Sequence, residues 1–374
     1  MFDNGFVQVV SERQQIDNLL TDMSNSCGFY LCLGGTKTSD VAGISAAGAT
    51  PELRRLTPAA DAEALLLGYT KTVEKLPVSP SGIVSPVVIT RACLQLAGIS
   101  PQVINCGVFT APQIPLFEAG LTPAECVVSG HAMTLNMVIE LFNRGFDFGI
   151  KEAARKKTIA IAECVPGGTT TALAVLVGLG YEANNSMSSS VPNCNHDARW
   201  NLVEQGLKIA RIESGHSKPF EILAAVGDPM QPFVLGMALA ACQTVSVILA
   251  GGSQMLAVYA LCKALSPDYA IEISKARIGV VTTKWVAFDQ NAGLVALSAQ
   301  IGAPFAASCP NFWLSRHVGL QAYEQGHVKE GIGAGAAMAL AYLAFGKNSS
   351  LLISKIDQSY DSMVGTLCPT HQEA

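Results

Sequence analysis

One loop of this sequence has residue types that could bind an anion, and a carboxylate, Glu163, lies just before it. The apolar run Ile159 to Ala162 leads into the loop and another, Ala172 to Leu179, follows it, which predicts a strand, a tight turn and a helix start. Glycines let the backbone approach a ligand, threonine hydroxyls donate hydrogen bonds, and the N–H groups of a first helical turn favour negative charge. The loop residues are Gly167, Gly168, Thr169, Thr170 and Thr171.

This loop favours a monophosphate over a nucleoside triphosphate. It lacks the Gly-Lys-Ser/Thr ending of a Walker A loop, so no lysine is placed to reach a β- or γ-phosphate. A simpler interpretation is that Gly167 and Gly168 only form a turn and that Thr169 only caps the helix. One cap does not require three consecutive threonines, so we favour the phosphate site.

A second carboxylate, Glu330, directly precedes three glycines at alternate positions and an alanine-rich segment expected to be helical. These glycines, Gly331, Gly333 and Gly335, expose backbone on both sides of the turn. A carboxylate at this position could accept a proton or a hydrogen bond from a ligand. It could equally complement the positive end of the helix dipole, and the residues alone leave both interpretations open.

Three further loops follow apolar runs that we interpret as strands, and they could line the same site. Lys37 lies in the first, Asp228 in the second and Ser253 in the third. The lysine could meet a phosphate, although a solvated loop lysine is the commoner case. Ordinary turn chemistry explains the other two loops equally well.

The elements that must position these loops follow from alternating patterns. Short apolar runs rich in β-branched residues alternate with longer helix-compatible stretches, which predicts an α/β fold: a doubly wound, mainly parallel, Rossmann-like sheet in three layers. We expect one domain over residues 1–374, with the terminal segments forming a smaller helical lobe. The predicted strands are Phe29 to Leu33, Val103 to Cys106, Thr158 to Ala162, Ile222 to Val226, Val245 to Ala250 and Ile278 to Thr282. Ligands on such sheets bind beyond the carboxyl ends of the strands.

Composition excludes several classes of protein. The net charge of −5 and the lack of any long Lys/Arg run argue against a nucleic-acid-binding surface. Mean hydropathy is +0.34, but the most apolar region, Phe233 to Cys262, is interrupted by Gln243 and by Gly251 to Gln254, so we expect no membrane span. Hydrophobic residues make up 49% and charged residues only 14%, which predicts self-association, most simply a homodimer.

The eleven cysteines are scattered singly, without a Cys-x-x-Cys pair, and several lie inside apolar runs. We therefore expect buried reduced thiols and a cytoplasmic compartment. Cys194 and His196 are the closest Cys/His pair and lack further ligands nearby, so no metal site is expected. The first 15 residues have no apolar h-region and do not resemble a secretory signal.

Taken in order, four stretches resemble the nicotinate-nucleotide:dimethylbenzimidazole phosphoribosyltransferases (CobT-like) of cobalamin nucleotide-loop assembly, and more closely their divergent archaeal and cyanobacterial branch. The stretches are Ser81 to Gly107, Glu163 to Thr171, Gly227 to Gly252 and Gly326 to Met338. The second and fourth carry specific motifs. This chain departs from the family by having Lys329 before the catalytic glutamate and by its rewritten phosphate loop, Pro166 to Thr171.

The resemblance implies transfer of the ribose phosphate of nicotinate mononucleotide to an azole or purine base, with Glu330 as the catalytic base and no metal or redox cofactor. It implies that Glu163, the Gly167 to Thr171 loop, Gly331 and Gly333 bind phosphate and ribose. The family has a lysine in the helix that follows its variable loop, and Lys208 resembles that lysine. The resemblance therefore makes Lys208 a further candidate for binding phosphate or ribose. The resemblance also makes Lys37, Ser81, Thr90, Asp228 and Ser253 candidates for the base pocket.

Two other classes of protein remain open. One is a different nucleotide-binding α/β enzyme, such as a dehydrogenase or a kinase, although no Gly-x-Gly-x-x-Gly follows the first predicted strand. The other is a non-catalytic ligand-binding relative. The presence of both Glu330 and the threonine loop argues against that second class.

Overall fold

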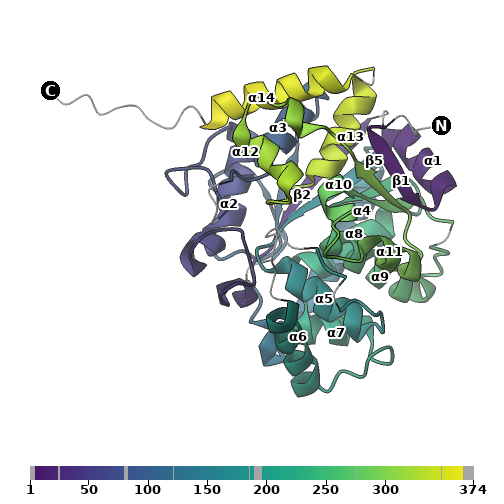
Figure 1. The fold of residues 1–374 in the computed structure, drawn as a ribbon. Coiled ribbons are helices and arrows are strands. Elements are labelled where there is room, and N and C mark those ends of the chain that lie inside the picture. Colours follow the sequence, from purple (N-terminus) through teal and green to yellow (C-terminus); the bar gives the residue numbers. More distant parts are fainter. Residues whose placement is uncertain are drawn as a thin grey trace.

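The protein is built around one eight-stranded sheet (Figure 1). The computed structural model describes residues 5–23, 26–79, 83–120, 122–184, 186–188, 196–273, 275–346 and 348–364. The strand order is β1-β8-β7-β6-β5-β2-β3-β4, in which β1 pairs antiparallel with β8 and every other neighbouring pair is parallel. The strands are β1 (Val7–Ser11), β2 (Cys27–Leu33), β3 (Gln102–Asn105), β4 (Phe117–Glu118), β5 (Thr158–Cys164), β6 (Ser246–Ala250), β7 (Ile278–Thr283) and β8 (Phe305–Ser308).

Each central strand contributes side chains to two hydrophobic cores, one on each face of the sheet. On β5, Ile159 and Ile161 pack into one core while Ala160 and Ala162 pack into the other. This alternation follows from the two-residue period of a strand, and burial on both faces explains why the strands are continuous apolar runs. The predicted doubly wound α/β fold is therefore confirmed.

Helices cover both faces of the sheet (Figure 1). On the first face lie α4 (Leu135–Ala153), α5 (Gly168–Gly178), α6 (His196–Ala210), α7 (Pro219–Val226), α8 (Met230–Ala241), α9 (Ser253–Leu265) and α11 (Leu294–Ile301). On the second lie α1 (Arg13–Met23), α2 (Pro51–Leu67), α3 (Val87–Leu96), α12 (Val318–Gln321), α13 (Ala334–Ala344) and α14 (Ser349–Val364). The short α10 (Lys284–Ala287) contributes to both cores. Strand β1 and helix α14 join these layers, and the division into a main domain and a terminal lobe stays a prediction.

Five of the six predicted strands are confirmed, and the sixth, Ile222 to Val226, is wrong because it lies in helix α7. Pro219 opens that helix, where its fixed φ suits the first turn. A carboxylate oxygen of Glu221 accepts a hydrogen bond from the Lys218 backbone N–H at 3.2 Å, which caps the helix start. A buried apolar run of this length does not by itself distinguish a strand from a helix.

The most apolar region of the chain is interior to the fold. Helices α8 and α9 and the strand β6 between them are almost wholly buried, which accounts for the hydropathy. Among the described residues, no helix is both long and apolar enough to cross a membrane.

The sheet has a topological switch point between β2 and β5. From β2 the chain adds β3 and β4 on one side, then returns to place β5 on the other and continues outward to β6, β7 and β8. Crossover connections then leave β2 and β5 in opposite directions, which opens a crevice at their carboxyl ends. The loops that follow these two strands are among those that sequence analysis selected for ligand binding.

Candidate active site

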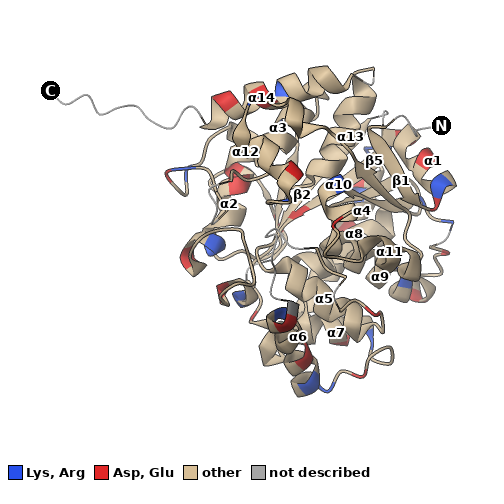
Figure 2. Cartoon of the chain, in the orientation of Figure 1, with Lys and Arg blue, Asp and Glu red and all other residues tan. Residues whose placement is uncertain are grey.

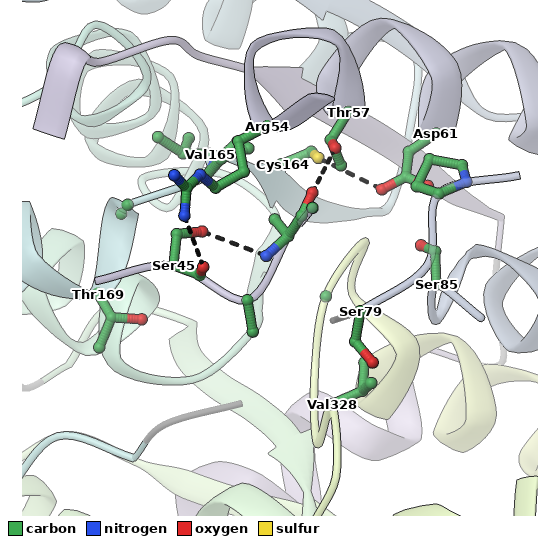
Figure 3. Close-up of a pocket in the computed structure, with 18 of the residues that line it drawn as sticks. Ser45, Arg54, Thr57, Asp61, Ser79, Ser85, Cys164, Val165, Thr169 and Val328 are labelled. Atoms are coloured by element: carbon green, nitrogen blue, oxygen red, sulfur yellow. Dashed lines mark hydrogen bonds between the residues drawn. The ribbon is translucent and has the colours of Figure 1, made fainter. Parts of the chain in front are cut away.

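A cavity of about 530 Å³ lies beyond the carboxyl end of β5 (Figure 3). One wall is formed by residues 163–169 of β5 and the loop after it, and the opposite wall by residues of the Glu330 loop. Helix α2 and the segment 43–49 before it close a third side. The cavity therefore brings together the two loops that carry the sequence motifs, although they lie far apart in the sequence.

The loop after β5 forms the predicted turn into helix α5. Gly167 has φ +85°, a left-handed conformation that favours glycine, and the helix begins at Gly168. A Cβ on Gly168 would lie 2.3 Å from Nε2 of Gln254, so close packing also requires glycine there. Both glycines and the half-buried Thr169 line the cavity, which places the positive end of the α5 dipole against it.

The three threonines of this loop have different environments. Thr169 faces the cavity, whereas Thr170 and Thr171 are fully buried. The Thr171 hydroxyl donates to Oδ2 of Asp228 at 2.5 Å, and within the described part of the chain Oγ1 of Thr170 has no hydrogen-bond partner. Of the three, only Thr169 therefore has a hydroxyl beside the cavity, and Thr171 anchors the loop from behind.

Asp228 is a buried anchor for the loop that follows β5. It is fully buried and does not line the cavity. Its carboxylate accepts from Thr171, from Nε2 of Gln254 at 2.8 Å and from the Met230 backbone N–H at 3.1 Å. Burial raises the pKa of Asp228, although these hydrogen bonds oppose the shift. Asp228 was expected to line the base pocket, but the structure places it behind the loop, where it holds Thr171 in position.

Glu330 lines the cavity and is half-buried. One carboxylate oxygen accepts from the Thr282 hydroxyl at 3.0 Å and from the Thr283 backbone N–H at 2.9 Å. The other accepts from the N–H groups of Gly331 at 3.2 Å and Gly335 at 3.3 Å. Burial raises the pKa of Glu330 to about 7 despite these four donors. A carboxylate with this pKa and access to a cavity is suited to general-base catalysis near neutral pH.

The backbone around Glu330 is strained. Val328, Lys329 and Ile332 all have positive φ, at 63°, 61° and 54°, in a region that side chains disfavour. Lys329, which departs from the family motif, is buried and forms an ion pair with Asp289. Burial would raise the pKa of Asp289, but the hydrogen bonds from Lys329 and Ser188 lower it overall. This buried pair fixes the loop so that Glu330 points toward the cavity.

Glu163 is the second cavity carboxylate. It sits near the end of β5, and its Oε2 accepts from the Val165 backbone N–H at 3.0 Å. Burial, reinforced by the negative charges of Asp228 and Glu330, raises the pKa of Glu163 to about 8. At neutral pH this side chain is mainly protonated, so it can donate a hydrogen bond and does not repel an anionic ligand.

Sequence analysis missed the wall contributed by α2. Arg54, Thr57 and Asp61 line the cavity and are buried. Burial raises the pKa of Asp61 to about 7. Their i, i+3, i+7 spacing puts them on one helix face. That spacing is the signal in the sequence from which this wall could have been predicted.

The remaining predicted residues lie outside this cavity. Lys37 is exposed and pairs with Glu125 at 2.7 Å, and Lys208 is exposed on α6. Thr90 is buried and supports the Glu330 loop by donating to the Ile332 carbonyl at 3.2 Å. Ser253 lines a small side cavity of about 80 Å³ that shares Glu163 and Glu330 with the main one. Ser81 lies outside the described residues.

The two glycines after Glu330 differ in position. Gly331 lines the cavity, whereas Gly333 caps α13 beneath the sheet, where a Cβ would lie 2.7 Å from the Cβ of Ala162. Among the described residues no group of His, Cys, Asp and Glu has the arrangement of a metal site, and nine described cysteines are free thiols.

Comparison with known proteins decides the family. The UPF0284 protein of Gloeothece citriformis is 43% identical over 334 residues, covering 88% of this chain and 90% of the relative. The UPF0284 protein of Microcystis aeruginosa is 44% identical over 340 residues, covering 90% and 93%. The chain belongs to the UPF0284 family. Residues 90–272 of this UPF0284 protein also match the family model described as phosphoribosyltransferase.

Solved structures agree with this assignment at the level of fold. This chain resembles CobT of Thermus thermophilus with a TM-score of 0.61 at 15% identity, and the match covers 93% of this chain and 92% of the other. A second structure, the nicotinate-nucleotide-dimethylbenzimidazole phosphoribosyltransferase of the same organism, gives 0.60 at 14% identity with the same coverage. The expected resemblance to the CobT-like phosphoribosyltransferases is confirmed by the family model over residues 90–272 and by the shared fold.

Proposed function

We propose that this phosphoribosyltransferase moves the ribose phosphate of nicotinate mononucleotide to a lower-ligand base, dimethylbenzimidazole or a similar azole or purine. The products are the α-riboside phosphate and nicotinate, for cobalamin nucleotide-loop assembly. The observation that carries the proposal is the cavity that is lined both by Glu330, with its pKa raised to about 7, and by the glycine start of α5. One wall suits a phosphate and the other suits proton transfer.

The reaction needs positioning and one base. The azole nitrogen attacks the anomeric carbon as the bond from that carbon to the pyridinium nitrogen breaks, and the electron pair stays on nicotinate. Because the pyridinium is already cationic, nicotinate leaves without a proton. Glu330 takes the azole N–H proton as the new bond forms. Attack on the face opposite nicotinate gives the α-riboside, and holding both reactants in line supplies much of the rate.

Glu163 fits beside this reaction as a neutral acid. Besides burial, the charge of Glu330 is one of the causes that raise the pKa of Glu163 to about 8, so an ionised Glu330 favours a protonated Glu163. A protonated Glu163 donates a hydrogen bond to a ribose hydroxyl and leaves the phosphate without a nearby negative charge.

The proposed function is tested by incubating the purified protein with nicotinate mononucleotide and a panel of bases: dimethylbenzimidazole, other benzimidazoles, adenine and phenols. Mass spectrometry should detect an α-riboside phosphate and free nicotinate in equal amounts with at least one base. Absence of product with every base, while another nucleotide binds tightly, would favour a different nucleotide enzyme or a ligand-binding relative.

Nicotinate mononucleotide should bind with its phosphate at Gly167 to Thr171, because a helix start after a glycine turn directs N–H donors at an anion. We expect the nearest contacts from the backbone of Gly168 and from Thr169, which line the cavity. A ligand-bound crystal structure checks this. A phosphate seated instead at Gly34 to Asp40 would contradict the prediction.

The protein should be a homodimer, as the low charged fraction suggests. In Figure 2, charged positions are scattered over the ribbon and separated by long uncharged stretches. Trp313, Leu314 and Val318 are 54%, 66% and 77% exposed, and we propose that a second copy covers them. Light scattering at micromolar concentration should give about twice the chain mass of 39.2 kDa, and a single-chain mass would overturn the dimer.

We also propose a cytoplasmic location. The nine described cysteines are unpaired, which fits a reducing compartment.

A further inference from the structure

Arg54 of α2 is a cation buried in the wall of the cavity. Arg54 is only 6% exposed, and it lines the cavity together with the start of α5. One guanidinium nitrogen, Nη1, donates to the Ser45 carbonyl at 3.3 Å, while Nε is buried and has no hydrogen-bond partner in the described part of the chain. Figure 3 shows the Arg54 guanidinium beside Ser45, to which a hydrogen bond is drawn.

Several other cations of this fold have carboxylate partners, whether they are buried or partly exposed. Lys329 pairs with Asp289, and Lys284 pairs with Glu324 at 2.8 Å. Arg55, the neighbour of Arg54 in sequence, holds Asp40 through two hydrogen bonds of 3.0 and 2.6 Å. Among the described residues Arg54 has no such pair. A guanidinium stays charged under all ordinary conditions, and burying it without a counter-ion is unfavourable.

The start of α5 adds a second positive feature to the same cavity. Gly167 and Gly168 present the first turn of an 11-residue helix, and its dipole favours an anion there. Asp61 lies seven positions after Arg54 on α2, a rise of about 10 Å along the helix, and among the described residues no ion pair joins the two side chains. The arrangement calls for an anion between the guanidinium and the helix start.

We propose that Arg54 is the counter-ion of the substrate phosphate, closing the phosphate site from the side opposite the α5 helix start. A planar guanidinium forms paired hydrogen bonds to a phosphate, which matches its free Nε edge. The proposal rests on the proposed function for the identity of the nucleotide, since nicotinate mononucleotide also carries a carboxylate. Arg54 thereby selects phosphorylated ribosides over the corresponding nucleosides.

The test compares Arg54→Met with Arg54→Lys and with the control Arg55→Met, whose side chain is 41% exposed and lies outside the cavity. Calorimetry would measure binding of nicotinate mononucleotide, nicotinamide mononucleotide and nicotinate riboside. We expect Arg54→Met to weaken both mononucleotides on the order of 100-fold or more, and the riboside by less than about 3-fold. The affinities of Arg54→Lys for the two mononucleotides should lie between those of wild type and Arg54→Met. The affinities of Arg55→Met should match those of wild type.

Two results would overturn the assignment. If nicotinamide mononucleotide binds Arg54→Met as tightly as wild type while nicotinate mononucleotide and nicotinate riboside do not, Arg54 binds the carboxylate. If all affinities are unchanged and the thermal midpoint without ligand falls, Arg54 is structural. Our proposal instead expects that midpoint to hold or rise, because Arg54→Met removes an uncompensated buried charge.

Inorganic phosphate separates failure of this proposal from failure of the proposed function. If phosphate raises the thermal midpoint of wild type but not of Arg54→Met, while nicotinate mononucleotide has no effect, Arg54 binds phosphate and the nucleotide assignment is wrong. If nicotinate mononucleotide turns over normally and phosphate stabilises both variants equally, the function stands and the Arg54 proposal fails.

Discussion

Glu330→Gln should lower turnover by about 100- to 10,000-fold while changing the affinity for nicotinate mononucleotide little. The variant keeps the shape of the side chain but loses the oxygen that accepts the azole proton. Single-turnover rates with the accepted base, together with calorimetric binding of the mononucleotide, check the prediction. Turnover near wild type would remove Glu330 as the base and make Glu163, the other cavity carboxylate, the next candidate.

Folding must be measured on the same preparation, because both oxygens of Glu330 accept backbone N–H groups. An amide nitrogen in the glutamine variant has to face at least one of these donors, which costs about 1–3 kcal/mol. A helix-dipole role alone would cost about 0.3–1 kcal/mol and leave the chemistry intact. A thermal midpoint and a turnover per folded molecule therefore distinguish the two roles.

The pH dependence supplies a control for the same variant. Since burial raises the pKa of Glu330 to about 7, wild-type turnover should rise about tenfold per pH unit below pH 7 and level off above it, and this limb should vanish in Glu330→Gln. The raised pKa also means that the folded chain binds this proton more tightly than the unfolded chain. Its stabilising contribution is therefore present below about pH 4.5 and is lost as the pH rises through 7.

Asp228→Ala should lower the free energy of unfolding by about 2–4 kcal/mol. Thr171, Gln254 and the Met230 backbone lose their shared acceptor inside a fully buried site, and each buried donor left without a partner costs about 1–3 kcal/mol before the structure relaxes. Because Thr171 belongs to the first turn of α5, the mononucleotide should also bind more weakly. Urea unfolding and calorimetry measure the two effects.

Asp268→Ala is the matched control for this substitution, because Asp268 is an exposed aspartate that does not line the cavity. It should change the free energy of unfolding by less than about 0.5 kcal/mol. If Asp228→Ala is as stable as this control, the buried network does not hold the phosphate loop. If it is destabilised but binds the mononucleotide normally, the network supports the fold and not the ligand site.

The central part of the fold was predictable because the buried parallel strands are continuous apolar runs between helical segments. Strand β8 was missed because Phe305–Ser308 is mostly small residues without a β-branched side chain. Strand β1 was missed because it is a half-exposed edge strand. Helix α7 was assigned as a strand because eight residues are too few for a helical period to stand out.

The two loops of the site were predictable because glycines and threonines beside carboxylates are visible in the sequence itself. Arg54 was not, because its significance comes from burial without a carboxylate partner, which only the packed chain creates. Lys37 and Lys208 drew attention as cations near motifs, yet both are exposed. A lysine reaches water easily on its flexible stem, so its position in a sequence says little about which ligand it meets.

The antiparallel pairing of β1 with β8 has a consequence for folding during synthesis. Val7 and Ser308 are partners in the sheet, so β1 leaves the ribosome roughly 300 residues before the strand with which it pairs. At typical rates of synthesis that interval is about 15 to 60 s. During this interval β8 has not yet been synthesised, and for much of it β6 and β7, which α1 contacts in the folded protein, are also missing. The apolar residues of β1 and α1 therefore lack these partners until translation is nearly complete.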